Sequence, residues 1–414
     1  MQPQVFDETH PLEEALVWGE PGIEALLGQL LPKSKSLFFS YYEVLEARKE
    51  FRYLRSLVEN EGIRFTQAKD AMVQRLKKTG APGEPSALRE VENLLLARAD
   101  AYYETYREEK QREFELAGNE RDFDDVYQQI QQDIKRILRE DEAAYGERAA
   151  TRLNHLLSLA HELPLANIFY GRDQSQALTD KLVLSSVKWE IRKPEVAVFK
   201  QALVELGYQD SLVEIERGTF EGGDVAMFDQ TCFVGVGART SLSAVEDLAQ
   251  KIGPVMDAYG VQVAAVVNQR HEREAEILHA PNDEHMHLMH LDMFWIPLEP
   301  KLVMAYTHEV DQRRVLRVAH KQGQTVMEDL GGFRHFMSER GIEIIEVDRR
   351  EQENFATNLL NLGGKKVIVA LSTNKRVIAE LEARGYRVLS AELNKLVGGY
   401  GATHCLTAPI RRTL

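Results

Sequence analysis

A helix-like segment that stops at a glycine and is followed by an apolar run recurs along this chain of 414 residues. Glycine just past the end of a helix can take the left-handed conformation that other residues disfavour. The runs 261–266 and 342–347, which follow two of these glycines, are predicted to be strands. A repeated α/β unit is therefore expected; on the junctions alone, an ordinary doubly wound sheet is a simpler interpretation than a radial or stacked repeat. The five junctions contain Gly62, Gly207, Gly260, Gly341 and Gly385.

The composition limits the class of protein. With 44% apolar residues the chain can bury a large core, and its formal charge of −14 argues against nucleic acid or an acidic membrane as partner. A cationic small molecule is weakly favoured. Residues 1–8 lack a basic region followed by an apolar run, and no later segment is apolar enough to span a bilayer. A cytoplasmic location is expected, in which the two cysteines stay reduced.

The segment between the first two junctions is far longer than the others and has a helical pattern. Apolar residues recur there at intervals of three or four, with charged residues between them. We predict a helical insertion over residues 71–164, which divides the α/β part into residues 1–70 and 165–414. The insertion is a candidate for subunit contacts in a homo-oligomer. Helices packed on their own domain would give the same pattern, so the oligomeric state stays open. The recurring residues are Leu88, Val91, Leu95, Phe123, Tyr127, Ile130, Ile134 and Ile137.

Cys405 follows a run of small residues and a histidine, at 398–404. Glycines let the backbone approach a ligand closely, so this thiol is a candidate nucleophile at the floor of a pocket. A free thiol, with a pKa of about 8.5, is only a few per cent thiolate at neutral pH, so a catalytic cysteine needs a nearby cation or base. A cationic substrate would supply that charge. Cys232 lies in an apolar run and is expected to be a buried core residue.

Several polar segments are ambiguous when each is taken alone. Residues 219–228 contain Glu221-Gly222-Gly223-Asp224, for which a Gly-Gly hairpin turn is the simplest interpretation. Asp173 and Asp292 are each more simply explained as turn or strand-end residues. His285, His287 and His290 raise the alternative of a metallohydrolase, although no HExxH motif or paired cysteines accompany them.

Taken together and in order, these segments are more specific than any one of them. The chain resembles the arginine deiminases of the guanidino-modifying superfamily, which also contains amidinotransferases, agmatine deiminases and dimethylarginine dimethylaminohydrolases. The resemblance implies a pseudo-fivefold α/β propeller of repeated ββαβ units with a helical insertion after the first unit. The segments that carry it are 167–173, 188–192, 221–224, 235–240, 290–292 and 398–405.

The resemblance implies a covalent mechanism on a guanidinium, a planar cation whose N–H groups are bound in pairs by carboxylates. Asp173 and Asp292 would hold the cation while Cys405 attacks its central carbon. His290, oriented by Glu221, would protonate the departing nitrogen and later deprotonate water. L-arginine would thus give L-citrulline and ammonia through an S-alkylthiouronium, with no metal or organic cofactor.

The resemblance also implies substrate-binding residues. Arg192 and Arg239 match positions that bind the substrate α-carboxylate, with Asn167 as a polar helper. Because agmatine lacks a carboxylate and would leave both arginines unpaired, arginine is the favoured substrate. Asp224 is expected to position the site by binding substrate or backbone nitrogens.

The sequence departs from the family pattern at several positions, which leaves alternatives open. Tyr170 stands where phenylalanine is usual, the 398–405 loop carries Tyr400 and no arginine, and residues 37–40 lack the acidic residues often found there. Another guanidino compound, such as agmatine or a methylated arginine, remains an alternative substrate, and an amine an alternative acceptor. A non-catalytic interaction protein is the third hypothesis.

Overall fold

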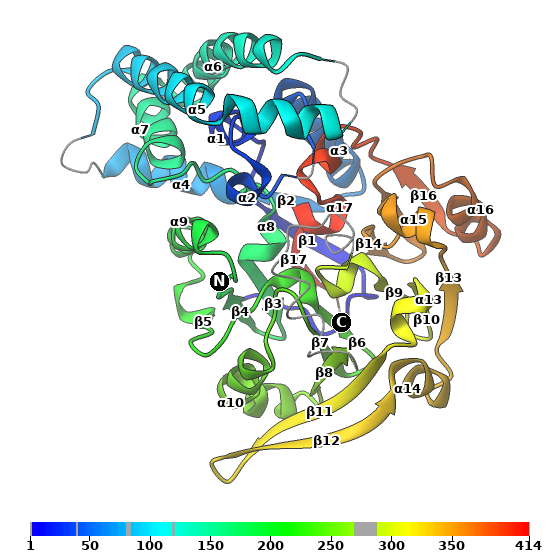
Figure 1. Ribbon diagram of the computed structural model, residues 1–414. Helices are drawn as coiled ribbons and strands as arrows, with labels where there is room; N and C mark the ends of the chain where they lie inside the picture. The colour runs from blue at the N-terminus through cyan, green and yellow to red at the C-terminus, as the bar shows by residue number, and fades with distance from the viewer. Residues whose placement is uncertain (1, 39, 80–83, 118–120, 269–287, 414) are drawn as a thin grey trace.

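The computed structural model describes residues 2–38, 40–79, 84–117, 121–268 and 288–413. It has a mixed α/β fold in which short three-stranded sets share one pairing pattern (Figure 1). In each set, two antiparallel strands are followed by a helix and a third strand parallel to the second. The sets are β17 (Ala408–Arg412), β1 (Leu12–Val17) and β2 (Arg64–Gln67); β3 (Ser175–Leu178), β4 (Lys181–Leu184) and β5 (Leu212–Glu214); β6 (Val225–Phe228), β7 (Thr231–Val236) and β8 (Gln262–Asn268); β9 (Trp295–Glu299), β10 (Leu302–Ala305) and β13 (Glu343–Glu346); β14 (Leu360–Gly363), β15 (Lys366–Val369) and β16 (Arg387–Ser390).

A helix connects the second and third strands of each set, as parallel strands require a crossover. The five predicted glycines follow these helices, and each has a left-handed φ between 64° and 85°. The predicted strands 261–266 and 342–347 are also confirmed, as β8 and β13. The crossover helices are α3 (Val44–Asn60), α9 (Lys193–Glu205), α10 (Leu242–Ala258), α14 (Phe333–Glu339) and α16 (Lys375–Ala383).

The first set contains both ends of the chain. β17, near the C-terminus, pairs antiparallel with β1, near the N-terminus. The third set is widened by β11 (Arg313–Lys321) and β12 (Gln324–Gly332), a long hairpin at the lower edge of Figure 1. Aromatic side chains such as Phe233 and Trp295 form the core between the third and fourth sets.

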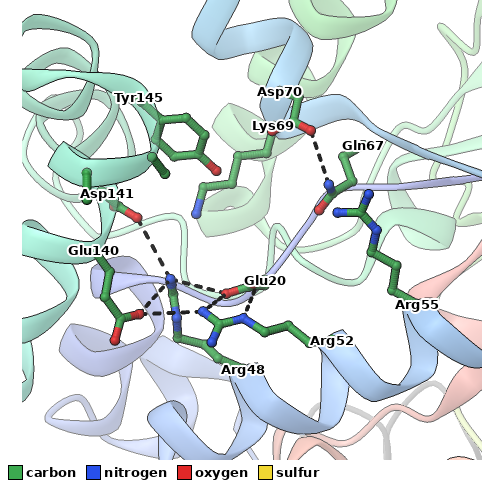
Figure 2. A pocket seen from close by; sticks show the side chains of 12 residues that line it. Glu20, Arg48, Arg52, Arg55, Gln67, Lys69, Asp70, Glu140, Asp141 and Tyr145 are labelled. Atoms are coloured by element: carbon green, nitrogen blue, oxygen red, sulfur yellow. Dashed lines mark hydrogen bonds and ion pairs between the residues drawn. The ribbon is translucent and has the colours of Figure 1, made fainter.

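Four longer helices follow β2 consecutively, where the sequence predicts helices (Figure 1). Their apolar residues face inward: Phe123, Ile130, Ile134 and Ile137 are fully buried. The helices pack against α9 and against α1 (Ile23–Gln29). A polar cavity lies between α3, α4 and α6 (Figure 2). The four are α4 (Ala68–Lys78), α5 (Leu88–Leu116), α6 (Phe123–Tyr145) and α7 (Glu147–Ser158).

The remaining elements are short helices and turns. In the described part of the chain, no helix is both long and apolar enough to cross a membrane. The short helices are α2 (Lys33–Ser36), α8 (Gly171–Gln174), α13 (Thr307–Val310), α15 (Arg349–Glu353) and α17 (Thr403–Leu406), and the 3-10 turns are η1 (Glu190–Arg192), η2 (Gln209–Ser211), η3 (Gly222–Asp224), η4 (Leu291–Met293) and η5 (Leu396–Gly399).

Gly341, between α14 and β13, offers a test of the junction geometry. Its φ is +64°, and a Cβ added there would meet no atom within 4 Å. Gly341→Ala is therefore expected to lower the free energy of unfolding by roughly 1 kcal/mol through backbone strain alone. Gly341→Asn should lower it less, because asparagine tolerates the left-handed region. Urea denaturation measures both variants, and equal stability of Gly341→Ala and wild type would contradict the assignment.

Candidate active site

The candidate site is built from turns that each lie just before the first strand of a set. Asp173 lies in α8 before β3, and Glu221 precedes η3 and β6. His290 and Asp292 lie at η4 before β9, and Cys405 lies in α17 before β17. These turns contact one another in series, α17 with α8, α8 with η3, and η3 with η4. All five side chains are buried.

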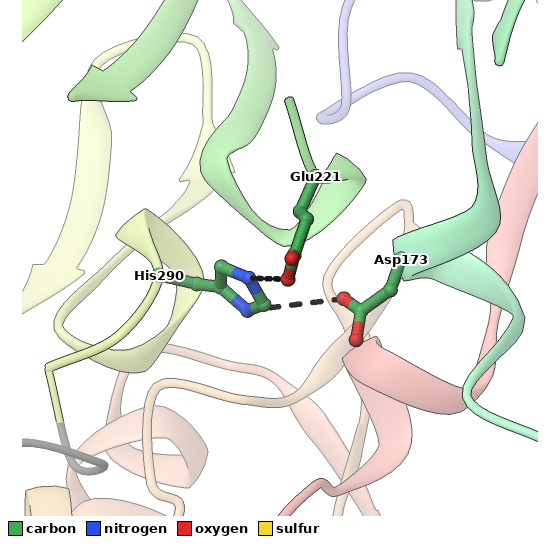
Figure 3. Close-up of side chains that lie close together, drawn as sticks. All are labelled: Asp173, Glu221 and His290. Carbon is green, nitrogen blue, oxygen red and sulfur yellow. Dashed lines mark hydrogen bonds and ion pairs between the residues drawn. The ribbon is translucent and has the colours of Figure 1, made fainter. Parts of the chain in front are cut away.

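Three of these residues form one compact cluster (Figure 3). His290 Nε2 lies 2.9 Å from Glu221 Oε2, and His290 Nδ1 lies 3.8 Å from Asp173 Oδ1. The expected contact between His290 and Glu221 is therefore present. The turn that supplies Glu221 is not the hairpin that the Gly-Gly pair suggests, because β5 pairs with β4, and β6 with β7. Gly223 is needed for another reason, since a Cβ there would lie 2.5 Å from His290 Nδ1.

The charges around His290 keep it protonated. Burial disfavours the imidazolium, but Asp173, the hydrogen bond to Glu221 and nearby Asp224 outweigh it and raise the pKa of His290 to about 9. Burial likewise opposes the charge on Glu221, yet Arg239 and His290 hold the pKa of that carboxyl well below its usual range. The unliganded site thus pairs an imidazolium with a carboxylate at neutral pH.

The thiol of Cys405 is held between an acid and an amide. Its Sγ lies 3.7 Å from Asp292 Oδ2 and accepts a hydrogen bond of 3.1 Å from the side-chain Nδ2 of Asn358. Burial, Asp292 and Asp173 raise the pKa of the Cys405 thiol well above its usual range. The thiol is therefore neutral until a positive charge arrives beside it.

Asp292 also belongs to a buried chain of polar groups. Its Oδ2 lies 2.7 Å from His404 Nδ1, whose other ring nitrogen lies 3.3 Å from Glu8 Oε2. Burial opposes ionisation of Asp292, but its hydrogen bond with His404 and the charges of His404 and His290 lower its pKa. The second oxygen, Asp292 Oδ1, is buried and has no hydrogen-bond partner among the described residues, and the same holds for Asp173 Oδ1.

The two arginines expected to bind a substrate carboxylate are bonded to acids of the site itself. Arg192 Nη1 lies 2.9 Å from Asp173 Oδ2, and Arg192 Nε lies 2.9 Å from Glu195 Oε2. Arg239 Nη1 lies 3.1 Å from Glu221 Oε2. Both guanidinium groups therefore neutralise buried carboxylates here, and their role toward a substrate stays a prediction.

The other expected binding residues surround this centre. The Asn167 side chain donates to the backbone oxygen of Ser36 at 2.6 Å. Asp224 Oδ1 accepts from the backbone nitrogen of Leu291 at 3.0 Å, the kind of backbone contact expected of it. Burial raises the pKa of Asp224 to about 7.

Tyr170 and Tyr400 both belong to the packing around the glycine run before Cys405. The Tyr170 hydroxyl donates to the backbone oxygen of Leu396 at 2.9 Å. A Cβ on Gly399 or Gly401 would lie 2.4 Å from the Tyr170 side chain, so the glycines are required by this ring. Tyr400 is buried in a left-handed conformation with φ of 71°.

Asn358 is a site residue that the sequence motifs did not indicate. Its Oδ1 accepts from the backbone nitrogens of Ala402 and Cys405, both at 3.2 Å, while its Nδ2 donates to Sγ. Asn358 lies just before β14, in the turn equivalent to those that hold the other site residues. Its position before the first strand of a repeated unit is the feature that could have indicated Asn358 from the sequence.

A metal ion is chemically conceivable at one place in the described residues. Ligand atoms of Asp173, Glu221 and His290 lie within 4.8 Å of one another. His290 is protonated in this arrangement, and an imidazolium has no free lone pair for a metal ion. The alternative site of three histidines cannot be placed, because His285 and His287 lie outside the described residues.

Comparison with known proteins decides the family. The family model of arginine deiminase matches residues 35–412. The chain belongs to the arginine deiminase family. Arginine deiminase of Halobacterium salinarum is 25% identical over 324 residues, covering 62% of this chain and 66% of that protein. The protein YkgA of Bacillus subtilis is 25% identical over 59% of this chain and 69% of its own length. The chain thus spans about two thirds of the length of these relatives.

The fold is shared with solved structures of the same superfamily. Dimethylarginine dimethylaminohydrolase from Pseudomonas aeruginosa has a TM-score of 0.53 at 12% identity, covering 96% of this chain and 99% of that one. A second structure of a dimethylarginine dimethylaminohydrolase gives a TM-score of 0.54, again at 12% identity, with the same coverage. At this identity the likeness shows the fold.

The protonation state of His290 can be tested directly. We expect the imidazolium of the unliganded protein to persist through neutral pH and to be lost as the pH rises through about 9. Asp173→Asn should move this pKa down toward the ordinary 6.5, because Asp173 is the nearby charge that raises it most. Histidine NMR titration measures it, with His290→Asn to assign the signal. Asp210→Asn, at an exposed position, is the control; a wild-type value near 6.5 would contradict the assignment.

Asn358 is predicted to be a positioning residue that favours the thiolate. Its amide lowers the pKa of Cys405, so Asn358→Ala should move the pH profile of Cys405 alkylation by iodoacetamide to higher pH. One lost hydrogen bond to a charged sulfur should slow alkylation roughly tenfold at a pH below the pKa. Asn361→Ala is the matched control, because Asn361 is equally buried and bonds only backbone oxygens of Pro297 and Leu298 through its amide nitrogen. The same shift in both variants would contradict a specific role.

Proposed function

We propose that this protein is an enzyme that hydrolyses the guanidinium group of L-arginine to L-citrulline and ammonia, with Cys405 as nucleophile. The supporting observation is a pair of buried carboxylate oxygens, Asp173 Oδ1 and Asp292 Oδ1, without hydrogen-bond partners in the described residues. Both acids act electrostatically on the same thiol. A guanidinium offers N–H donors on both edges of one plane, so it would satisfy both oxygens while its carbon faces the sulfur.

Binding of the cation would prepare the nucleophile. The positive charge offsets the effect of Asp173 and Asp292 on Cys405, which lowers the pKa of the thiol and lets it release its proton to water. The thiolate then forms a bond to the guanidinium carbon, giving a tetrahedral adduct. His290 donates its proton to one terminal nitrogen, the bond from carbon to that nitrogen breaks, and ammonia leaves an S-alkylthiouronium.

The second half of the reaction returns the site to its starting state. His290, now neutral, takes a proton from water as the oxygen attacks the same carbon. The bond from carbon to sulfur breaks, the hydroxyl proton of the adduct passes to the departing sulfur, and citrulline and the neutral Cys405 thiol are released. Glu221 and Arg239 would hold the His290 ring in place through both steps, since Glu221 bonds both groups.

The substrate assignment draws on the arginines and on the relatives. Arg192 and Arg239 lie beside the cluster of carboxylates, where they would bind the α-carboxylate of arginine by exchanging part of their present bonds. The Halobacterium relative is an arginine deiminase, and the Pseudomonas dimethylarginine dimethylaminohydrolase was crystallised with citrulline. Asn167, Tyr170, Asp224 and Tyr400 would shape the remainder of the pocket.

The same proposal includes the architecture. We propose that the five ββαβ sets close into a pseudo-fivefold propeller, with β17 and β1 joining its ends. Residues 1–70 and 165–414 would form this catalytic domain, and 71–164 the helical insertion. The site would then lie on the pseudo-axis, to which each set contributes one turn, including that of Asn358.

The activity is tested by a product profile from arginine, agmatine, methylated arginines and arginine with added amines. We expect citrulline and ammonia in equal amounts from arginine alone. Cys405→Ser should reduce turnover at least about a thousandfold, because a hydroxyl does not replace the thiolate. Cys232→Ala is the control, because Cys232 is buried in β7 outside the site.

Two outcomes would overturn the assignment. Full turnover by Cys405→Ser would contradict the mechanism. Ornithine release that depends on an added amine would identify an amidinotransferase, and turnover of agmatine or methylated arginine in preference to arginine would change the substrate.

A further inference from the structure

The polar cavity between α3, the start of α4, and the inserted helix α6 is separate from the candidate active site (Figure 2). Its volume is about 550 Å³, within the range of small-molecule sites. Its lining residues differ from those of the candidate active site, and four basic and four acidic side chains are among them. The proposed reaction does not use it.

Lys69 is the residue that sets this cavity apart. Its side chain is 3% exposed and extends into the space bordered by Asp141 and Tyr145 (Figure 2). Its ammonium forms no hydrogen bond or ion pair with any residue that the structure describes. Burying an ammonium without a partner is costly, so a protein normally pairs it.

The acids around Lys69 are already used by two arginines. Arg48 lies 3.1 Å from Glu20 and 3.2 Å from Glu140, and Arg52 binds both oxygens of Glu20. Asp141 accepts a hydrogen bond from Asn154 and lies 3.9 Å from Arg48. The nitrogen of Lys69 has no direct partner among the described residues, and Asp141 is the nearby charge that offsets it most.

Lys69 is nevertheless charged. Burial opposes the ammonium, but the nearby carboxylate of Asp141 raises its pKa above the ordinary value. The hydroxyl of Tyr145 also lines the cavity and makes no hydrogen bond within the described parts of the chain. A charged donor and a neutral donor therefore face one cavity, from α4 and from α6.

We propose that this cavity binds a small monocarboxylate, held by the ammonium of Lys69 and the hydroxyl of Tyr145. A carboxylate can accept from both donors at once, one through each of its oxygens. A dianion such as phosphate would face Asp141, Glu140 and Glu20 at close range, and this repulsion disfavours it. The bound carboxylate would join the inserted helix α6 to the start of α4. It can belong to a simple carboxylic acid or to an amino acid.

The proposal is tested by thermal-shift titration of the full chain with sodium acetate, L-alanine and sodium phosphate at matched ionic strength. We expect a saturable rise in melting temperature with one or both carboxylates, as a ligand that binds only the folded state must produce. Lys69→Met should weaken the apparent affinity at least tenfold, and Tyr145→Phe several-fold. Lys77→Met, at an exposed position of the same helix, should bind as the wild type does.

The arms of the experiment separate the possible outcomes. Stronger stabilisation by acetate identifies a simple acid, and stronger stabilisation by L-alanine identifies an amino acid. Binding that survives Lys69→Met would lie at another place, such as Arg192 and Arg239, and would overturn the proposal. Absence of saturable binding by wild type, or a preference for phosphate, would overturn it too. If Lys69→Met fails to fold, Tyr145→Phe decides, because it removes only a hydroxyl; unchanged affinity there would reject the site.

Discussion

The buried guanidinium of Arg172 connects the parts of the chain on which the active site depends. It donates to the backbone oxygens of His404 and Thr407, on either side of Cys405, and to that of Val225 at the start of β6. It also pairs with Glu8, which lies beside the ring of His404. An arginine fixes several acceptors at once because its donors form a rigid planar fork. The turns of three different sets are therefore held in register by one fully buried side chain, and loss of that side chain would remove the guanidinium that offsets the buried charge of Glu8.

The charges of the site leave Asp292 as the acid beside the thiol. Arg192, Arg239 and His290 are bound to Asp173 and Glu221, so these two acids are largely neutralised on one side. Asp292 keeps its negative charge through His404; its Oδ2 lies 3.7 Å from the Cys405 sulfur, and its Oδ1 has no hydrogen-bond partner among the described residues. Leaving that buried oxygen without a hydrogen bond costs free energy, which favours binding of any ligand that can donate to it. The same charge keeps the Cys405 thiol neutral, so loss of the thiol proton is coupled to the binding of a cationic ligand in the site.

Much of the fold follows from local sequence, because the features that mark it are local. A glycine such as Gly341 after a helix indicates a residue in the left-handed conformation. The spacing of Phe123, Ile130 and Ile134 indicates a buried helical face. Strand pairing is not local, and this is why the Gly-Gly pair at 222–223 suggested a hairpin that does not form. Asn358 was missed for the opposite reason. It has no motif around it, and only its place before the first strand of a set relates it to Asp173 and Cys405.

The pairing of Arg192 and Arg239 shows what residue types alone leave undetermined. Their matched positions suggest a substrate carboxylate as partner, yet in the unliganded protein such charges cannot stay buried alone, so they bond the nearest acids. If these arginines bind a substrate carboxylate, they must therefore give up part of their bonds to the acids of the site. In the proposed reaction, the guanidinium end of the substrate would take over contacts with Asp173, while its carboxylate end would take over contacts with the arginine that Asp173 releases. A ligand carrying only one of these ends would leave one buried charge unmatched, so recognition of both ends in one step follows from the charge balance itself.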